Sequence, residues 1–210
     1  MNNLSVRVAV LLFGMVAIGS VGCTSGGSQT ITGTKGSNPL SAGKTVALFP
    51  TREKTTLTPE TVAMLTSACN TTINAKFPGM FPNMKFMSND QTLDKLSASP
   101  THLDTMTNLF EQHEKTQIYL KPNLKSLADY MKADYLVFSK LSSEKLDVIL
   151  MRSGTMALDV TILSRSGEKI YQGVGEFRKW GMFGAGKITS SNAAAICDTM
   201  FASAMAGYSR

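Results

Sequence analysis

The hydrophobic positions of this chain divide it into three stretches. Residues 8–18 form one continuous apolar run, and residues 24–43 contain only two large apolar side chains. From Lys44 onward, apolar positions recur at the spacings of helices and strands. A segment as polar as 24–43 cannot bury enough surface to offset the entropy lost on ordering. We therefore expect a flexible segment there and a folded domain over residues 44–210.

The first part of the domain alternates short strands with amphipathic helices. Residues 45–49 are an apolar run stopped by Pro50, which is typical of a buried strand. Thr58, Pro59 and Glu60 supply a hydroxyl cap, a first-turn proline and an acid, which together predict a helix start. The spacing then predicts this helix to residue 76, a break over 77–82, a strand at 84–87 and helices at 90–96, 102–114 and 124–132.

After Ala133 the apolar period changes to two, which predicts strands with one buried face. The clearest alternation is at Met156, Leu158, Val160 and Ile162. The pattern predicts a strand over 134–141 that can continue to 150, then a turn at 152–154, the alternating strand and a turn at 164–167. A strand over 169–178 and a glycine-rich loop over 181–186 follow. The last predicted element is a helix with one apolar stripe, formed by Ala193, Ile196, Cys197, Met200 and Ala204.

Two glycines, Gly173 and Gly175, fall inside the last predicted strand, where they indicate a bulge or a close approach of another backbone. The order of elements is β-α-β-α-α-α-β-β-β-α. This order predicts an α/β (α+β) domain with a single mixed five-stranded sheet, a C-terminal three-strand antiparallel meander, and helices packed on the sheet.

The N-terminal run has the length of a secretory signal. Arg7 precedes it, and its eleven residues are far fewer than the ~20 that a membrane-spanning helix needs. The run ends in Gly-Ser-Val-Gly before Cys23, which resembles a bacterial lipobox, although Ser20 replaces the commonest leucine. In lipoproteins such a cysteine receives a diacylglycerol group and the signal is cut just before it. A plain secreted signal, or an uncleaved anchor with an incidental cysteine, are the alternatives.

The lipobox resemblance implies a signal peptide at 1–22, an acylated flexible tether at 23–43 and a periplasmic domain at 44–210. Several acyl chains hold a protein on a membrane essentially permanently, because each buried CH₂ contributes about 0.8 kcal/mol. Thr24, and not an aspartate, follows the cysteine. By resemblance to the sorting rule of enteric bacteria, we expect the outer membrane, with the domain facing the periplasm.

Three further segments resemble a group of envelope lipoproteins. They are the strand at 46–50, the helix-to-strand step at 127–137, and the meander at 158–162 with 166–170 and Gly173. The group includes the periplasmic domain of the curli secretion channel, the lipoprotein that activates a penicillin-binding protein, and the N-terminal domain of the Tol translocation protein. The chain has no insertions matching the barrel hairpins of the curli channel, so we expect a tethered domain and not a pore.

Composition excludes several classes of function. The net charge of +6 and pI near 9.3 are mild, and the basic residues are not clustered as in a nucleic-acid binder, so we expect no nucleic-acid partner. Three cysteines and two histidines are too few for zinc-finger arrays or multi-haem proteins. We expect no metal and no cofactor.

No catalytic motif is complete in this sequence. Residues 181–187 match the first seven positions of a P-loop, but Ile188 stands where a serine or threonine must bind magnesium. His113 opens a zinc-protease-like motif whose second histidine is replaced by Gln117. No Gly-x-Ser-x-Gly elbow is present, and two histidines leave little scope for a Ser-His-Asp triad. We expect no catalytic residues and a protein that is not an enzyme.

Two sets of residues remain as candidate sites. Cys69 and Cys197 each lie on the apolar stripe of a helix, the first and the last. If these helices are neighbours on the sheet, the oxidising periplasm allows a disulfide, and the alternative is two buried free thiols. The second set is a basic and aromatic cluster whose residue types are common at interface hot spots, or which closes one end of the core. Its members are Arg178, Lys179, Trp180, Met182 and Phe183.

Together these features predict an outer-membrane-anchored, non-enzymatic module that binds an envelope protein of unknown identity. Its expected task is to assemble or regulate a machine of cell-wall synthesis or secretion. One alternative is a ring-forming secretion or transport subunit, which requires a stable oligomer. The other is a hydrolase with an unrecognised site, which requires a deep pocket lined by titratable groups of shifted pKa.

Overall fold

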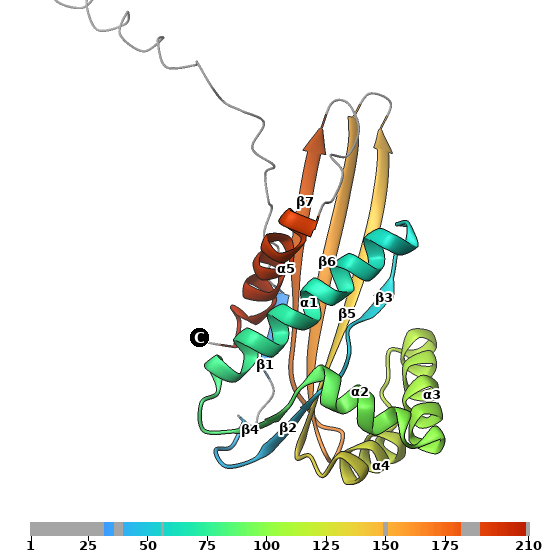
Figure 1. Ribbon diagram of the computed structural model, residues 1–210, viewed down its shortest axis with the longest axis vertical. Helices are drawn as coiled ribbons and strands as arrows, with labels where there is room; N and C mark the ends of the chain where they lie inside the picture. Colours follow the sequence, from blue (N-terminus) through green and yellow to red (C-terminus); the bar gives the residue numbers. More distant parts are fainter. Residues whose placement is uncertain (1–31, 36–39, 56, 149–150, 182–189, 209–210) are drawn as a thin grey trace, which may run out of the picture.

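A computed structural model describes residues 32–35, 40–55, 57–148, 151–181 and 190–208 of the chain (Figure 1). The strands in this part are β1 (Thr32–Lys35), β2 (Thr45–Leu48), β3 (Arg52–Lys54), β4 (Lys85–Met87), β5 (Tyr135–Val148), β6 (Met151–Ser164) and β7 (Lys169–Gly181). The helices are α1 (Pro59–Met80), α2 (Asn89–Ser97), α3 (Pro100–Thr116), α4 (Lys121–Met131) and α5 (Ser190–Met205).

All the strands belong to one mixed sheet with the order β1-β7-β6-β5-β2-β4, in which β3 continues beside β5 beyond the end of β2. Strand β2 lies between β4 and β5 and is parallel to both, whereas β5, β6 and β7 form an antiparallel meander. The predicted α/β fold class, the element order and the meander are therefore confirmed. The short strands β1 and β3 were not predicted.

The sheet carries a hydrophobic core on each face, and β2 contributes to both. Val46 and Leu48 face the core under α1 and α5, which cross the sheet in Figure 1. Ala47 and Phe49 face the second core, under α2, α3 and α4. Burial on both sides explains why this segment is a continuous apolar run and does not alternate.

The antiparallel strands follow the predicted alternation. Met156, Leu158, Val160 and Ile162 of β6 are buried in the α1/α5 core, while Asp159 and Thr161 between them point to the opposite face. The predicted close approach at β7 is also confirmed. A Cβ built on Gly173 would lie 1.9 Å from the Ala204 carbonyl oxygen, and one on Gly175 would lie 1.8 Å from that of Met200. Helix α5 thus packs its backbone directly onto β7.

Two predicted boundaries were wrong. Helix α1 continues through Pro78 to Met80 instead of breaking at residue 77. A proline so near the end of a helix removes only one of the last backbone hydrogen bonds, so the helix tolerates it. The predicted turn at 152–154 is strand: Gly154 of β6 pairs with Lys145 of β5 and with Lys179 of β7. The pairing of three long strands outweighs the local turn preference of one glycine.

Within the segment expected to be a tether, the structure places strand β1. Its four residues pair antiparallel with β7, Thr32 opposite Val174 and Lys35 opposite Tyr171. An edge strand exposes unpaired N–H and C=O groups, and these accept an additional strand whatever its side chains. The apolar pattern therefore did not predict β1. Within the described residues, no helix combines the length and the apolar character that crossing a bilayer requires.

Candidate functional site

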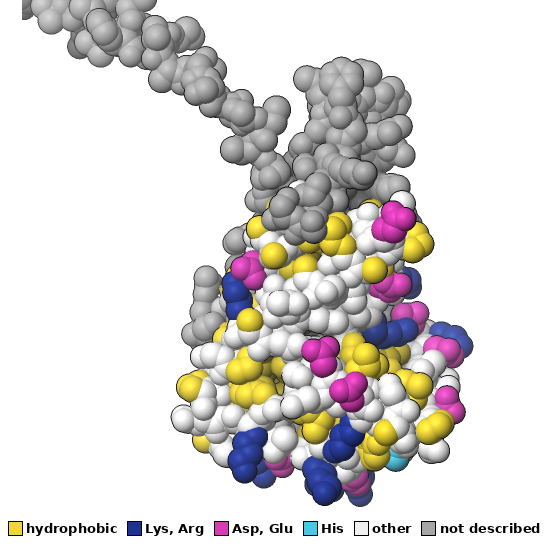
Figure 2. All heavy atoms as spheres, in the orientation of Figure 1, with side chains coloured by type: hydrophobic (Ala, Val, Ile, Leu, Met, Phe, Trp, Pro, Cys, Tyr) yellow, Lys and Arg dark blue, Asp and Glu magenta, His cyan; other side chains and the backbone are white. Residues whose placement is uncertain are grey.

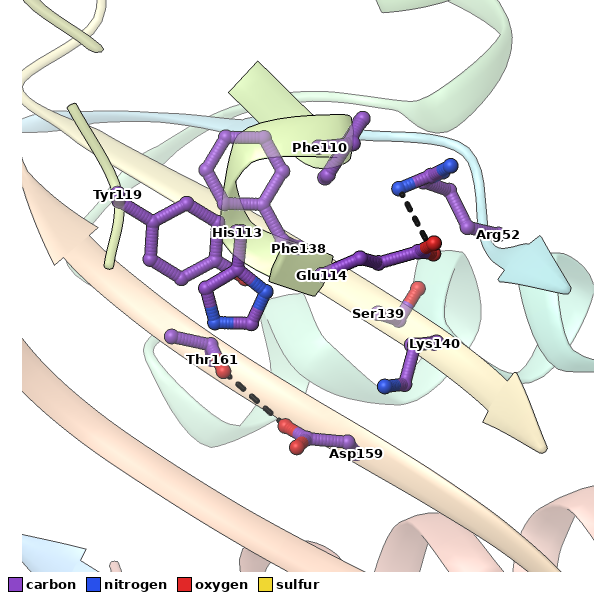
Figure 3. A pocket seen from close by; sticks show the side chains of 10 residues that line it. All are labelled: Arg52, Phe110, His113, Glu114, Tyr119, Phe138, Ser139, Lys140, Asp159 and Thr161. Carbon is purple, nitrogen blue, oxygen red and sulfur yellow. Dashed lines mark hydrogen bonds and ion pairs between the residues drawn. The ribbon is translucent and has the colours of Figure 1, made fainter. Parts of the chain in front are cut away.

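A small pocket lies where the end of α3 meets the second face of the sheet (Figure 3). It is built on aromatic rings: Phe110 and Tyr119 pack on Phe138 of β5, with ring centres 5.1 and 5.6 Å away. The His113 ring stacks on Tyr119 at 3.9 Å and is almost parallel to it. The stack fixes the orientation of the imidazole.

The end of α3 explains how Tyr119 comes to lie under His113. Gln117 adopts a left-handed conformation with φ of 58°, and its N–H donates to the His113 carbonyl oxygen at 2.8 Å. Such a cap stops the helix and reverses the chain direction. The chain after Gln117 therefore runs back along the last turn of α3, and Tyr119, two residues later, stacks on the His113 ring.

Charged groups from three strands surround the rings. Arg52 of β3 lies 3.5 Å from the Glu114 carboxylate and stacks over the Phe110 ring at 4.3 Å. Asp159 of β6 accepts hydrogen bonds from the Thr161 hydroxyl and the Gln172 amide, each at 3.0 Å. Lys140 of β5 lines the same pocket, and Figure 3 shows it on the side of Asp159. The pocket thus holds two cationic and two acidic side chains around the aromatic rings.

Two titratable groups of the pocket have shifted pKa values. Burial lowers the pKa of His113 below its ordinary value of 6.5; Lys140 and Lys169 add to this shift, while Asp159 and Glu114 oppose it. Burial also raises the pKa of Tyr119, and the negative charge of Asp159 acts in the same direction. His113 is therefore held neutral, and Tyr119 is held protonated, at neutral pH.

The size of this pocket limits its chemistry. Its cavity volume is about 20 Å³, which accommodates a single water molecule, whereas small-molecule sites span roughly 300–1,000 Å³. Shifted pKa values are present, but the depth that a hydrolase site requires is not found at this pocket. Among the described residues, no three His, Cys, Asp or Glu side chains are grouped to hold a metal ion.

The neutral state of His113 predicts a pH dependence of stability. Because its pKa is lower in the folded than in the unfolded chain, the unfolded chain binds more protons below pH 6.5, and stability falls as the pH decreases through that window. We expect the urea midpoint to decrease between about pH 7 and about pH 5, and His113→Gln to flatten that slope. His102→Gln, on the same helix, retains His113 and should keep the slope. An unchanged slope in His113→Gln would contradict this assignment.

The candidate residues of the sequence analysis fall elsewhere. Cys69 on α1 and Cys197 on α5 are both fully buried, and both are free thiols here. The Cys197 sulfur lies 3.5 Å from the Leu65 carbonyl oxygen, one turn before Cys69. A hydrogen bond with Cys197, together with burial, raises the pKa of the Cys69 thiol. The structure thus brings the two cysteines together, and the disulfide stays a prediction.

The predicted partner-binding cluster is only partly described. Arg178, Lys179 and Trp180 belong to strand β7, not to a loop, and pair with Thr155, Gly154 and Ser153. Their side chains lie outside the described part of the chain. Met182 and Phe183 lie outside the described residues, as do Cys23 and most of the P-loop-like segment.

Sequence reasoning noticed only His113 in the pocket. It missed the other polar residues, which are Arg52, Glu114, Tyr119, Ser139, Lys140, Asp159 and Thr161. For Lys140, Asp159 and Thr161 the one signal was that polar residues interrupt the second face of β5 and β6. Such a pattern normally marks a solvated face, and only the docking of α3 converts it into a pocket.

No family model matches this chain, and no curated protein matches it. Solved structures with a similar fold include the hypothetical protein CT253 from Chlamydia trachomatis (12% identity, 80% of this chain and 96% of that one, TM-score 0.50). A second is the PelC dodecamer from Paraburkholderia phytofirmans, with 13% identity, coverage of 84% of this chain and 96% of that one, and a TM-score of 0.44. A third is the lipoprotein GNA1162 from Neisseria meningitidis, with 11% identity, coverage of 72% of this chain and 91% of that one, and a TM-score of 0.40. At these identities the likeness is one of fold.

Proposed function

We propose that this protein is an acylated lipoprotein of the bacterial outer membrane whose periplasmic domain binds another envelope protein and performs no catalysis. The anchor rests on the lipobox-like Val21, Gly22 and Cys23, preceded by the apolar run at 8–18. The non-catalytic part of the proposal rests mainly on one observation: the pocket around His113 and Tyr119 holds no more than a water molecule.

The acylation makes a direct prediction. In cells fed an alkyne analogue of palmitate, the wild-type chain should carry the label, because the diacylated cysteine holds the acyl chains. Cys23→Ser should lose the label completely and shift to the soluble fraction. Cys69→Ser is the matched control, since it removes a different cysteine and should keep both the label and the membrane fraction. A wild-type chain without label would overturn the proposed anchor.

The end of the meander is the proposed contact with the partner. Arg178, Lys179 and Trp180 lie at the far end of β7, beyond the last residue that pairs with β1. Arginine and tryptophan are enriched among residues that dominate binding energy. A photoactivatable side chain at position 180 should give a discrete adduct in intact cells. The same side chain in place of Ile118, which is 61% exposed after α3, should not. Equal adducts from both positions would argue against this contact.

A further inference from the structure

Helix α4 presents a row of lysines to solvent. Its apolar side, with Leu124, Leu127 and Met131, is buried in the second core. Lys121 and Lys125 are exposed on the opposite side, and Lys132 follows at the C-cap, also exposed. Spacings of four and seven residues place all three on one helical face.

Two other elements bring cations to the same end of the molecule. Lys44, just before β2, and Arg165, in the turn between β6 and β7, line an open depression together with Lys125. The aliphatic part of Lys121 lies against Gly167 of that turn, where an added Cβ would be 2.9 Å from its Cγ. We call these five residues, Lys44, Lys121, Lys125, Lys132 and Arg165, the basic pole. Figure 2 shows dark blue side chains, with a few acidic ones among them, at the lower end of the visible face.

The basic pole carries an excess of positive charge. Asp134 pairs with Lys44 at 3.2 Å, and Asp129 pairs with Arg165. A hydrogen bond from the Thr45 N–H, more than any other contact, holds the pKa of Asp134 below its usual range. Within the described residues, no carboxylate pairs with the three lysines of the α4 face. That face is therefore available for an external anion.

The path of the chain brings this pole within reach of the acyl anchor. Thr32 is nine residue steps after Cys23, and these steps can span at most about 30 Å. Thr32 is held opposite Val174, five residues from the start of β7, or about 17 Å above the pole end of the sheet. The segment is long enough for the pole to reach the membrane while β1 stays paired with β7.

We propose that the basic pole seats the domain on the anionic lipid headgroups of the membrane that holds its acyl chains. This inference rests on the proposed acylation of Cys23. Juxtamembrane lysines strengthen binding to an anionic surface by about fivefold each. The α4 lysines therefore favour an orientation in which this end of the domain rests on the membrane over free rotation of the tethered domain. Seating on α4 directs the opposite end of the meander, with the proposed contact at Trp180, away from the lipid.

The test uses the full acylated chain in vesicles of phosphatidylcholine alone or with phosphatidylglycerol as about one-fifth of the lipid. Amide hydrogen exchange is followed over α4 and residues 164–167. We expect exchange there to be several-fold slower on the anionic vesicles, and the difference to disappear at about 0.5 M salt, where the Debye length is only a few ångströms. K121E/K125E should lose the difference. K54E/K115E, which reverses two other exposed lysines, should keep it.

Equal exchange on both vesicles, with the chain bound to each, would overturn the seating while leaving the acylation intact. Slower exchange of α4 in the presence of an acidic protein, but not on anionic vesicles, would likewise overturn the seating on lipid. A chain that fails to sediment with neutral vesicles overturns the acyl anchor and, with it, this inference. Comparing each variant on the two vesicle types removes any effect of the substitutions on folding stability.

Discussion

Gly175→Ala is expected to cost the domain about 3 kcal/mol of unfolding free energy. The new methyl carbon would lie 1.8 Å from the Met200 carbonyl oxygen and within 2.8 Å of the Ala204 nitrogen. Both are backbone atoms of α5, so no side chain can rotate away, and the helix must lift from the sheet. For a domain of this length the loss corresponds to a decrease of about 6–12 °C in Tm, measurable by calorimetry.

Gly79→Ala is the matched control for this prediction. Gly79 lies in the last turn of α1, and an added Cβ there meets no atom within 4 Å. Alanine is a better helix former than glycine, so this variant should be neutral or slightly more stable. A Gly175→Ala protein as stable as wild type would show that α5 does not rest on β7 as described.

The second large effect concerns Cys69 and Cys197. In protein recovered from the oxidising periplasm without reductant, we expect a disulfide, with a mass about 2 Da below the reduced chain. The two thiols lose two protons and two electrons to a thiol–disulfide oxidoreductase. Because burial and a raised pKa suppress the thiolate in the folded state, the bond should form before α5 docks.

The bond would close a loop of more than a hundred residues. Loop-closure entropy gives it a stabilising effect of roughly 4–5 kcal/mol at most. Reductant should therefore lower the Tm of the wild-type protein but not that of a Cys69→Ala/Cys197→Ala variant. Two alkylatable thiols in the unreduced protein would contradict the prediction and leave the cysteines as small buried hydrophobes.

The sequence was informative wherever a signal is local. The run at 45–49 predicted a buried strand, the Thr58-Pro59-Glu60 start predicted α1, and the period of two after Ala133 predicted the meander. Each of these signals comes from neighbouring residues whose spacing follows from the geometry of one element. Gly173 and Gly175 likewise indicated a close approach, although not which element approaches.

The candidate pocket depends on contacts that no local pattern contains. Arg52, His113 and Asp159 come from segments that are far apart in the chain, and they meet because α3 docks on β5 and β6. The basic pole arises in the same way, from α4, the start of β2 and the turn after β6. A periodicity records which face of an element is buried, but it does not record which other element covers that face.

By itself, then, the sequence determined the element order, the mixed sheet with its antiparallel end, and the expectation of an acylated cysteine. These follow from short-range spacing and from a motif that is contiguous in the chain. Only the tertiary structure decided that α5 rests on two glycines, that Cys69 meets Cys197, and that β1 joins the edge of β7. Each of these is a long-range contact, selected by packing and backbone pairing among elements distant in sequence.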